Sequence, residues 1–158
     1  MSTNHPLAED LGFLLSRASG VVARSASASL APLGLRVRSY SVLAFAGEDS
    51  AGVTQRRLAA LMGLDPSQVV ALVDDLESSG LVTRAPDPTD RRNKLIIATE
   101  KGHRIREEAQ QRVDRAQSGH FDGVPQQHLE QLRSMLRRIA IPEEVPAGSG
   151  TESASGAQ

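Results

Sequence analysis

The sequence contains no cysteine and no tryptophan, and its 158 residues include one tyrosine and three phenylalanines. The absence of cysteine excludes disulfide bonds, thiolate zinc sites and thiol-based sensing of oxidants. Because aromatic side chains are so few, the sequence also lacks the stacking surfaces on which single-stranded nucleic acids bind. We therefore expect a hydrophobic core built from aliphatic side chains.

An excess of positive charge is also absent. The chain carries 18 Lys and Arg residues against 19 Asp and Glu residues, a formal net charge of -1 at pH 7. A globally basic DNA-binding protein is therefore excluded, and any affinity for DNA must come from a local arrangement of cations. The length corresponds to one domain, or to one domain with an extension.

No apolar run approaches the ~20 residues that a helix needs to cross a bilayer. The apolar segment near the N-terminus superficially resembles a signal peptide. Glu9 and Asp10, however, stand where a signal peptide has positive charge, and Arg17 interrupts the run soon afterwards. These features predict a cytoplasmic protein.

Motifs that carry catalysis are missing as well. The sequence has no Gly-rich phosphate loop, no nucleophile elbow and no paired acid and base. The four histidines are scattered without the spacing of a metal site. The sequence therefore predicts no catalytic residue, no metal site and no bound cofactor.

The most informative segment runs from residue 54 to residue 100. Its first nine residues have apolar side chains one helical turn apart, and Gly63 can adopt the positive φ that ends a helix. Asp65 and Pro66 are typical of the N-cap and first position of the next helix. Two helices joined by so short a turn indicate a helix-turn-helix, whose second helix usually lies in a DNA major groove.

A short hairpin follows the second helix. Residues 81–83 begin a strand, a charged loop comes next, and Gly52-Val53 resembles the extra strand of winged folds. The predicted fold class is mainly α with a small β-wing (α+β). It combines a winged helix-turn-helix lobe, residues 35–100, with a helical dimerisation region.

Apolar stripes at both ends of the chain predict the dimerisation region. Helices are expected at residues 7–29 and, after a break, up to Pro142, and neither has a sheet large enough to cover it. Packing across a twofold axis would bury both stripes. The predicted units are 1–34 and 101–141 for dimerisation, with a disordered tail at 142–158. The residues expected in the dimer interface are Leu7, Leu11, Leu14, Leu129, Leu132, Leu136 and Ile139.

A family resemblance lies in the hairpin region. The strand Gly80-Leu81-Val82-x-Arg84 precedes the loop Asp87-Pro88-x-Asp90-Arg91-Arg92 and then Leu95, Thr99 and Gly102. In this order the residues resemble the signature of the MarR (multiple antibiotic resistance regulator) family of bacterial transcription factors. The likeness covers roughly residues 7–140. It implies a homodimeric repressor that binds a palindromic operator in double-stranded DNA and is released by a small, often anionic or aromatic, effector.

Polar and cationic residues of the winged lobe are the candidates for DNA contact. Ser67 and Gln68 open the second helix, where side chains can reach base edges, although Ser67 could instead only help to cap it. Thr54 could likewise be only an N-cap.

The cations of the charged loop suit contact with phosphates or with a narrow minor groove, the alternative being a solvated charged turn. The resemblance implies that Arg92 reaches DNA while Asp90 orients the wing. The predicted contacts are Ser39, Thr54, Gln55, Arg57, Pro66, Ser67, Gln68, Val70, Ala71, Arg84, Asp90, Arg91, Arg92 and Lys94.

The second helix departs from the family pattern. Val70 and Ala71 stand where the family often has Thr or Ser and Arg, so an arginine grip on guanine is missing and contact with a thymine methyl remains. Asp74, Asp75 and Glu77 make its later turns acidic, which also fits a solvated face. Together with the neutral total charge, this leaves a second hypothesis open: a winged-helix module that binds protein without specific DNA binding.

The resemblance implies an effector site between the dimer helices and the winged lobe. Arg17 and Arg24 on the first helix, with Arg38 and Tyr40 on the second, are the candidate residues. An arginine there could hold a carboxylate through two parallel hydrogen bonds. Each arginine could equally be an exposed cation or a partner in an ion pair between helices.

Overall fold

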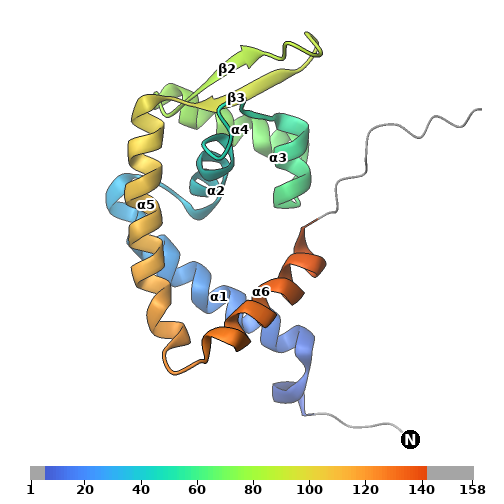
Figure 1. The fold of residues 1–158 in the computed structure, drawn as a ribbon, viewed down its shortest axis with the longest axis vertical. Coiled ribbons are helices and arrows are strands. Elements are labelled where there is room, and N and C mark those ends of the chain that lie inside the picture. Colours follow the sequence, from blue (N-terminus) through green and yellow to red (C-terminus); the bar gives the residue numbers. More distant parts are fainter. Residues whose placement is uncertain (1–5, 142–158) are drawn as a thin grey trace, which may run out of the picture. The chain divides into compact units, whose positions relative to one another are not determined.

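The computed structural model describes residues 6–141, which contain six α-helices, three short 3-10 helices and one small sheet (Figure 1). The chain divides into two compact units, residues 1–124 and 125–158, and each is described by itself. The mainly helical architecture with a small antiparallel sheet confirms the predicted fold class. The predicted helix end at Pro142 and the predicted disordered tail, 142–158, lie outside the described residues.

The N-terminal helix begins later than the apolar pattern predicts. Residues Leu7–Glu9 form the 3-10 turn η1, and α1 runs over Leu11–Leu30. Asp10 between them has an extended backbone, and its Oδ1 accepts a hydrogen bond from the amide of Phe13 at 2.7 Å. Asp10 is therefore the N-cap of α1. The single helix predicted over residues 7–29 was wrong at this point, because the leucine spacing is the same on both sides of the break.

The other elements of the larger unit follow in chain order. They are η2 (Ala31–Leu33), α2 (Val37–Ala46), β1 (Val53–Thr54), α3 (Gln55–Met62), α4 (Pro66–Ser78), β2 (Val82–Pro86), β3 (Lys94–Ala98), α5 (Glu100–Ser118) and η3 (Gly119–Phe121).

The sheet has the order β1-β3-β2, and both pairs are antiparallel. Val53 of β1 pairs with Ile96, while Val82 pairs with Ala98 and Pro86 with Lys94. The ladder between β2 and β3 thus ends at Pro86 and Lys94, and the loop between them extends beyond it. This arrangement confirms the predicted hairpin and the predicted extra strand.

The core is aliphatic, as the composition predicts. It brings together α1, α2, α3, α4, β2, β3 and α5, and no aromatic side chain of residues 6–141 is among its buried members. Burying so many branched side chains is the main stabilising term of a fold of this size. The largest fully buried side chains are Leu30, Leu43, Leu58, Ile96, Val42, Val69, Val73 and Val82.

Helix α5 begins in close contact with the start of β2. Thr99 donates hydrogen bonds from its hydroxyl to the carbonyl of Gly80 (2.7 Å) and from its amide to the carbonyl of Leu81 (3.0 Å). A Cβ atom on Gly102 would lie 2.0 Å from the carbonyl oxygen of Leu81. Because that distance is far below van der Waals contact, only glycine fits at this position. The junction ties α5 to the turn that joins α4 and β2.

The smaller unit contributes one described helix, α6 (Gln126–Ala140). Its apolar side chains recur at helical spacing and are all at least partly exposed; Leu132 is 37% exposed and Ile139 is 73% exposed. A helix with an uncovered apolar face of this kind needs a partner surface. No helix within residues 6–141 is long and apolar enough to span a membrane.

Candidate nucleic-acid interface

Side chains cap both helices of the helix-turn-helix. Thr54 Oγ1 accepts a hydrogen bond from the amide of Arg57 at 3.1 Å, which makes Thr54 the N-cap of α3. Gly63 has a φ of 60° and ends α3, as predicted. At the start of α4, Asp65 and Gln68 form a capping box in which the amide of Asp65 donates to Gln68 Oε1 at 3.2 Å. These bonds fix the first turn of α4.

The capping box gives Gln68 a structural role that the sequence analysis missed. Ser67 was considered, as an alternative to its DNA contact, as the residue that helps Asp65 to cap the helix, whereas the structure forms the capping box with Gln68. The signal was present, because an acid followed three residues later by glutamine is a helix-start signature. Gln68 remains exposed, so a contact of its side-chain amide nitrogen with DNA stays a prediction.

Helix α4 separates an apolar face from an outward face. Val69, Val73 and Leu76 are buried in the core. Leu72 is half-buried against the same core, whereas the opposite side of the helix faces solvent, where Val70 is 37% exposed. The predicted contacts Pro66, Ser67, Gln68, Val70 and Ala71 are all on this exposed face.

Two carboxylates order the wing loop, residues 87–93. Asp87 Oδ1 accepts hydrogen bonds from the amide and the hydroxyl of Thr89, at 2.8 and 2.6 Å. These hydrogen bonds lower the pKa of Asp87 below its ordinary value. Asp90 Oδ1 accepts from the amide of Arg92 at 3.0 Å, and Asp90 Oδ2 accepts from the side-chain amide of Asn93 at 3.3 Å. The loop therefore has a defined conformation even though it is exposed.

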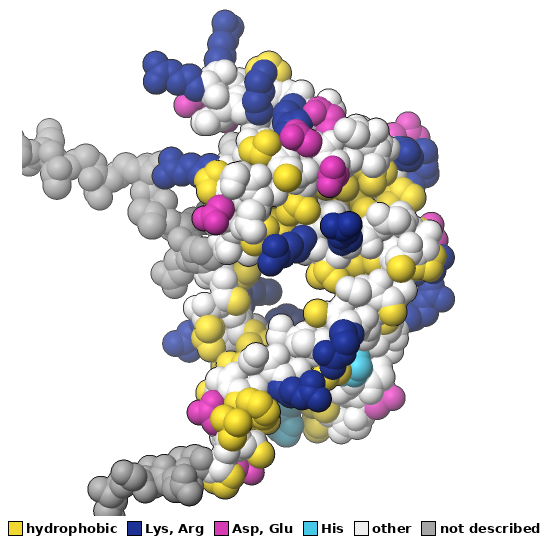
Figure 2. Space-filling view, turned by 180° about the vertical axis from the view of Figure 1, so that it is seen from behind, with side chains coloured by type: hydrophobic (Ala, Val, Ile, Leu, Met, Phe, Trp, Pro, Cys, Tyr) yellow, Lys and Arg dark blue, Asp and Glu magenta, His cyan; other side chains and the backbone are white. Residues whose placement is uncertain are grey.

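The loop and the first residue of β3 present their cations outward. Arg91, Arg92 and Lys94 are exposed, and their side chains take part in none of the hydrogen bonds or ion pairs recorded between residues 6 and 141. Figure 2 shows Lys and Arg side chains projecting from the end of the molecule that carries the wing. Exposed, uncompensated cations on an ordered hairpin are suited to contact phosphates.

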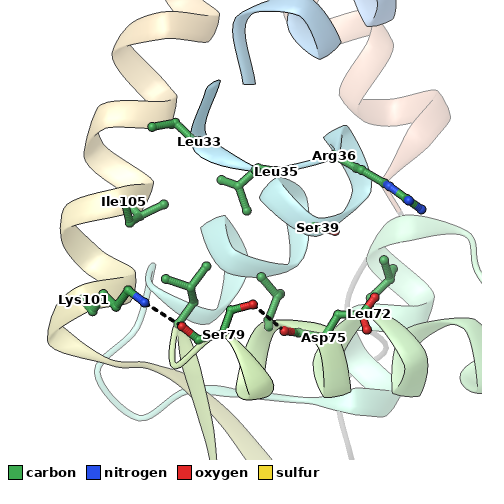
Figure 3. A pocket seen from close by; sticks show the side chains of 12 residues that line it. Leu33, Leu35, Arg36, Ser39, Leu72, Asp75, Ser79, Lys101 and Ile105 are labelled. Atoms are coloured by element: carbon green, nitrogen blue, oxygen red, sulfur yellow. Dashed lines mark hydrogen bonds between the residues drawn. The ribbon is translucent and has the colours of Figure 1, made fainter. Parts of the chain in front are cut away.

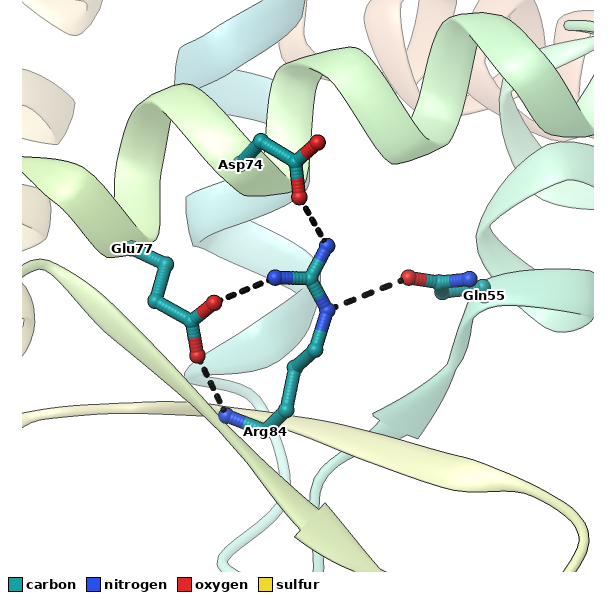
Figure 4. Close-up of polar contacts among 4 residues, drawn as sticks. All are labelled: Gln55, Asp74, Glu77 and Arg84. Carbon is teal, nitrogen blue, oxygen red and sulfur yellow. Dashed lines mark hydrogen bonds and ion pairs between the residues drawn. The ribbon is translucent and has the colours of Figure 1, made fainter.

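Arg84 of β2 is placed differently (Figure 4). Its Nη2 lies 2.5 Å from Asp74 Oδ1, its Nη1 forms an ion pair with Glu77, and its Nε donates to Gln55 Oε1 at 3.4 Å. The backbone amide of Arg84 also donates to Glu77 Oε1 at 3.1 Å. Burial alone would lower the pKa of Arg84, but the hydrogen bonds and charges of Asp74 and Glu77 raise it overall.

The remaining predicted DNA contacts lie around the helix-turn-helix. Ser39 is half-buried near the start of α2, and Arg57 is half-buried in the first turn of α3. Their contact with DNA stays a prediction.

No hydrogen bond or ion pair within residues 6–141 joins the predicted effector residues to one another. Arg17 and Arg24 of α1 and Arg38 of α2 are exposed. The hydroxyl of Tyr40 donates to Gln110 Oε1 of α5 at 2.5 Å. Burial, together with the negative charge of Asp114, raises the pKa of Tyr40 above its ordinary value.

A small pocket on α5 borders this tyrosine contact. It has a volume of about 260 Å³ and is lined by Arg106, Glu107, Gln110 and Gln111. The Nε of Arg106 is buried and has no hydrogen-bond partner among the described residues. A buried donor without a partner is costly, and an anionic group could satisfy it. The sequence analysis did not single out Arg106, because its place beside Tyr40 arises only when α2 packs on α5.

A larger pocket of about 410 Å³ lies between α2, α4 and α5 (Figure 3). Lys101 Nζ donates to the carbonyl of Ser79 at 2.8 Å, and Ser79 Oγ donates to the carbonyl of Asp75 at 2.9 Å. Ser39 is the one predicted site residue that lines it. Its apolar lining residues are Leu33, Leu35, Leu72, Leu76, Leu81 and Ile105.

Within residues 6–141 no group of three or more His, Cys, Asp or Glu residues is placed to hold a metal ion.

Comparison with known proteins gives consistent matches. Residues 33–93 match the model of the MarR family. The structure of CouR from Rhodococcus jostii RHA1 bound to p-coumaroyl-CoA is 55% identical in sequence, with a TM-score of 0.83 over 88% of this chain and 97% of that chain. A MarR-family transcriptional regulator from Rhodococcus sp. RHA1 is 54% identical, with a TM-score of 0.82 over 88% of this chain and 98% of that chain.

A further match concerns a protein bound to nucleic acid. The transcriptional repressor CouR bound to a 23-mer DNA duplex is 31% identical, with a TM-score of 0.75 over 85% of this chain and 94% of that chain. The matches therefore extend well beyond the winged lobe, to most of the described chain.

Proposed function

Because this chain belongs to the MarR family of transcriptional regulators, we propose that it is a homodimeric repressor that binds a palindromic operator and is released by an aromatic acyl thioester of coenzyme A. Its site of action would be DNA in the cytoplasm. The proposal includes no catalytic step, because its relatives are described as regulators.

The ordered, cationic wing is the main structural support for the proposed DNA-binding function. Asp87 and Asp90 hold the loop, and Arg91 and Arg92 extend from it without a protein partner among residues 6–141. The outward face of α4 supplies the neighbouring surface for a major groove. The repressor structure bound to a 23-mer duplex, 31% identical, supports the same role here.

Uncovered apolar side chains support the dimer. In the larger unit, Leu7 and Leu11 are 65% and 69% exposed. In the smaller unit, Ile139 is 73% exposed. Exposed leucine and isoleucine on amphipathic helices are typical of a protein interface. A twofold dimer would present two copies of α4 about 34–36 Å apart, and this spacing requires a palindromic site.

The effector class is proposed from the p-coumaroyl-CoA complex of the 55%-identical relative. Such a ligand has an aromatic acyl group and several negative charges. Arg106, whose Nε is buried without a partner among the described residues and whose charge acts on Tyr40, could take one anionic group. The exposed arginines Arg17, Arg24 and Arg38 remain predicted contacts for the others.

We expect p-coumaroyl-CoA to weaken operator binding by roughly 5–150-fold, the usual range of coupling between two sites on a regulator. The operator would first be identified by genome-wide capture of bound DNA. Binding would then be measured by fluorescence anisotropy on the full chain, with sedimentation to test for a particle of twice 16.8 kDa. Coenzyme A alone and p-coumarate alone are the controls and should change the affinity less than about threefold, because each lacks half of the proposed contacts.

The pocket beside Tyr40 can be tested in the same assay. Arg106→Met keeps the stem that packs near Gly47 but removes the unsatisfied donor. It should raise by about tenfold the p-coumaroyl-CoA concentration that releases half of the bound operator. This factor corresponds to the loss of one charge-assisted hydrogen bond. If a folded dimer bound no duplex, the proposed repressor function would be contradicted. The alternative hypothesis of a protein-binding module would then be favoured. Binding that p-coumaroyl-CoA leaves unchanged would contradict the effector class only.

A further inference from the structure

Arg84 differs from the other cations predicted to contact DNA, because protein groups already occupy its guanidinium. Its three nitrogens face Asp74, Glu77 and Gln55, and its side chain is only 21% exposed. The two carboxylates come from α4, the glutamine comes from α3, and Arg84 itself lies on β2 (Figure 4). One side chain thus links both helices of the helix-turn-helix to the first strand of the wing.

Three of the five N–H groups of the Arg84 guanidinium already have protein acceptors, so contact with a phosphate would compete with these partners. Asp74 and Glu77 are 58% and 40% exposed, and both lie on the acidic later turns of α4. Without Arg84, two uncompensated carboxylates would stand near the DNA backbone and repel it. If Arg84 left the two carboxylates for a phosphate, its attraction to that phosphate would be opposed by the repulsion of both carboxylates from the DNA backbone.

The position of Arg84 along the strand suits a mechanical role. It lies two residues before Pro86, where the ladder between β2 and β3 ends and the wing loop begins. Glu77 holds this point twice, through the backbone amide and through the guanidinium of Arg84. Fixing both the strand and its side chain sets the angle at which the hairpin leaves α4.

We propose that Arg84 is a positioning residue for DNA binding, which holds the wing at a fixed angle to α4 and does not itself contact DNA. This inference rests on the proposed DNA-binding function. It assigns a different role to Arg84 than to Arg92, although both are arginines of the same hairpin.

The test uses Arg84→Lys and Arg84→Met in the full chain, with operator affinity measured over a range of salt concentrations. Lysine keeps the charge but lacks the planar fork that reaches three partners at once. We expect both variants to weaken binding by about tenfold. Arg84→Lys keeps the charge beside Asp74 and Glu77, so it should leave the salt slope, the slope of log affinity against log salt concentration, unchanged. If Arg84 contacted phosphate, Arg84→Lys would bind nearly as well as the wild type. Arg84→Met would then reduce the slope by about 0.9 for each lost contact. That pattern would overturn the proposal.

A second measurement reads the wing angle without DNA. Because the chain has no cysteine, Arg91→Cys gives a single labelling site at the wing loop. The distribution of distances between the two spin labels of a dimer should be broader in Arg84→Lys than in the wild type. In Arg92→Ala it should keep the wild-type width. Equal widths in all three proteins would contradict the positioning role. Failure of the wild type to bind any duplex would instead count against the proposed function.

Discussion

Replacing Arg92 by alanine should weaken binding to the operator by about 100-fold. Arg92 is exposed at the wing loop, and its amide is held by Asp90 at 3.0 Å, so its side chain leaves an ordered backbone. A hydrogen bond between charged groups contributes about 1.5 kcal/mol, and a dimer loses two of them. Since about 1.4 kcal/mol corresponds to a factor of ten, the two losses multiply to about 100-fold.

The salt dependence provides the decisive measurement. Losing one phosphate contact on each wing should reduce the salt slope by about 1.8, at roughly 0.9 per phosphate. Arg104→Ala is the matched control, because it removes the same charge from an exposed ion pair with Glu100 on α5. Exposed pairs contribute little, so this variant should bind within about twofold of the wild type. Equal losses in both variants would mean that total charge, rather than the wing, determines affinity.

Replacing Gly102 by alanine should destabilise the folded chain by about 3 kcal/mol, the upper part of the usual range for overpacking. The new Cβ would lie 2.0 Å from the carbonyl oxygen of Leu81 and 3.3 Å from Leu43 Cδ1. A backbone carbonyl cannot rotate away as a flexible side chain can, and this one also accepts the amide of Thr99. The better helix propensity of alanine, up to about 1 kcal/mol, offsets only part of this cost.

Thermal unfolding followed by circular dichroism would measure the effect. The expected fall in melting temperature is about 6–12 °C for a chain of this size. Gly119→Ala serves as the control, since a Cβ at Gly119 would meet no atom within 4 Å. Its melting temperature should change by no more than about 4 °C, because no atom has to move. If the two variants have the same melting temperature, the contact between Gly102 and Leu81 is not tight.

The local signals in the sequence proved sufficient for the helix-turn-helix. Gly63 has the positive φ expected of a helix end, and Asp65 and Pro66 occupy the predicted N-cap and first helical position of α4. These features depend on a few neighbouring residues, so they can be read without knowledge of the rest of the fold.

Features that depend on distant residues could not be read in this way. Asp74 and Glu77 lie three residues apart and so share a helix face, but the strand residue that meets them depends on the angle of the hairpin. The sequence predicted a DNA contact for Arg84, which stays a prediction, and gave no sign of its ion pairs with the two carboxylates. The break at Asp10 was missed for another reason, because the leucine period continues across it.

The junction between Gly102 and Leu81 also bears on how a signal could travel. Helix α5 has 19 residues and is therefore about 28 Å long. One end is attached to the turn between α4 and β2 through Thr99 and Gly102, so the helix can act as a rigid lever on the winged lobe. Over that length a tilt of about 5° moves the far end by about 2.5 Å. A small displacement of the far end of α5, near Ser118, would thus be coupled to a rotation of the winged lobe.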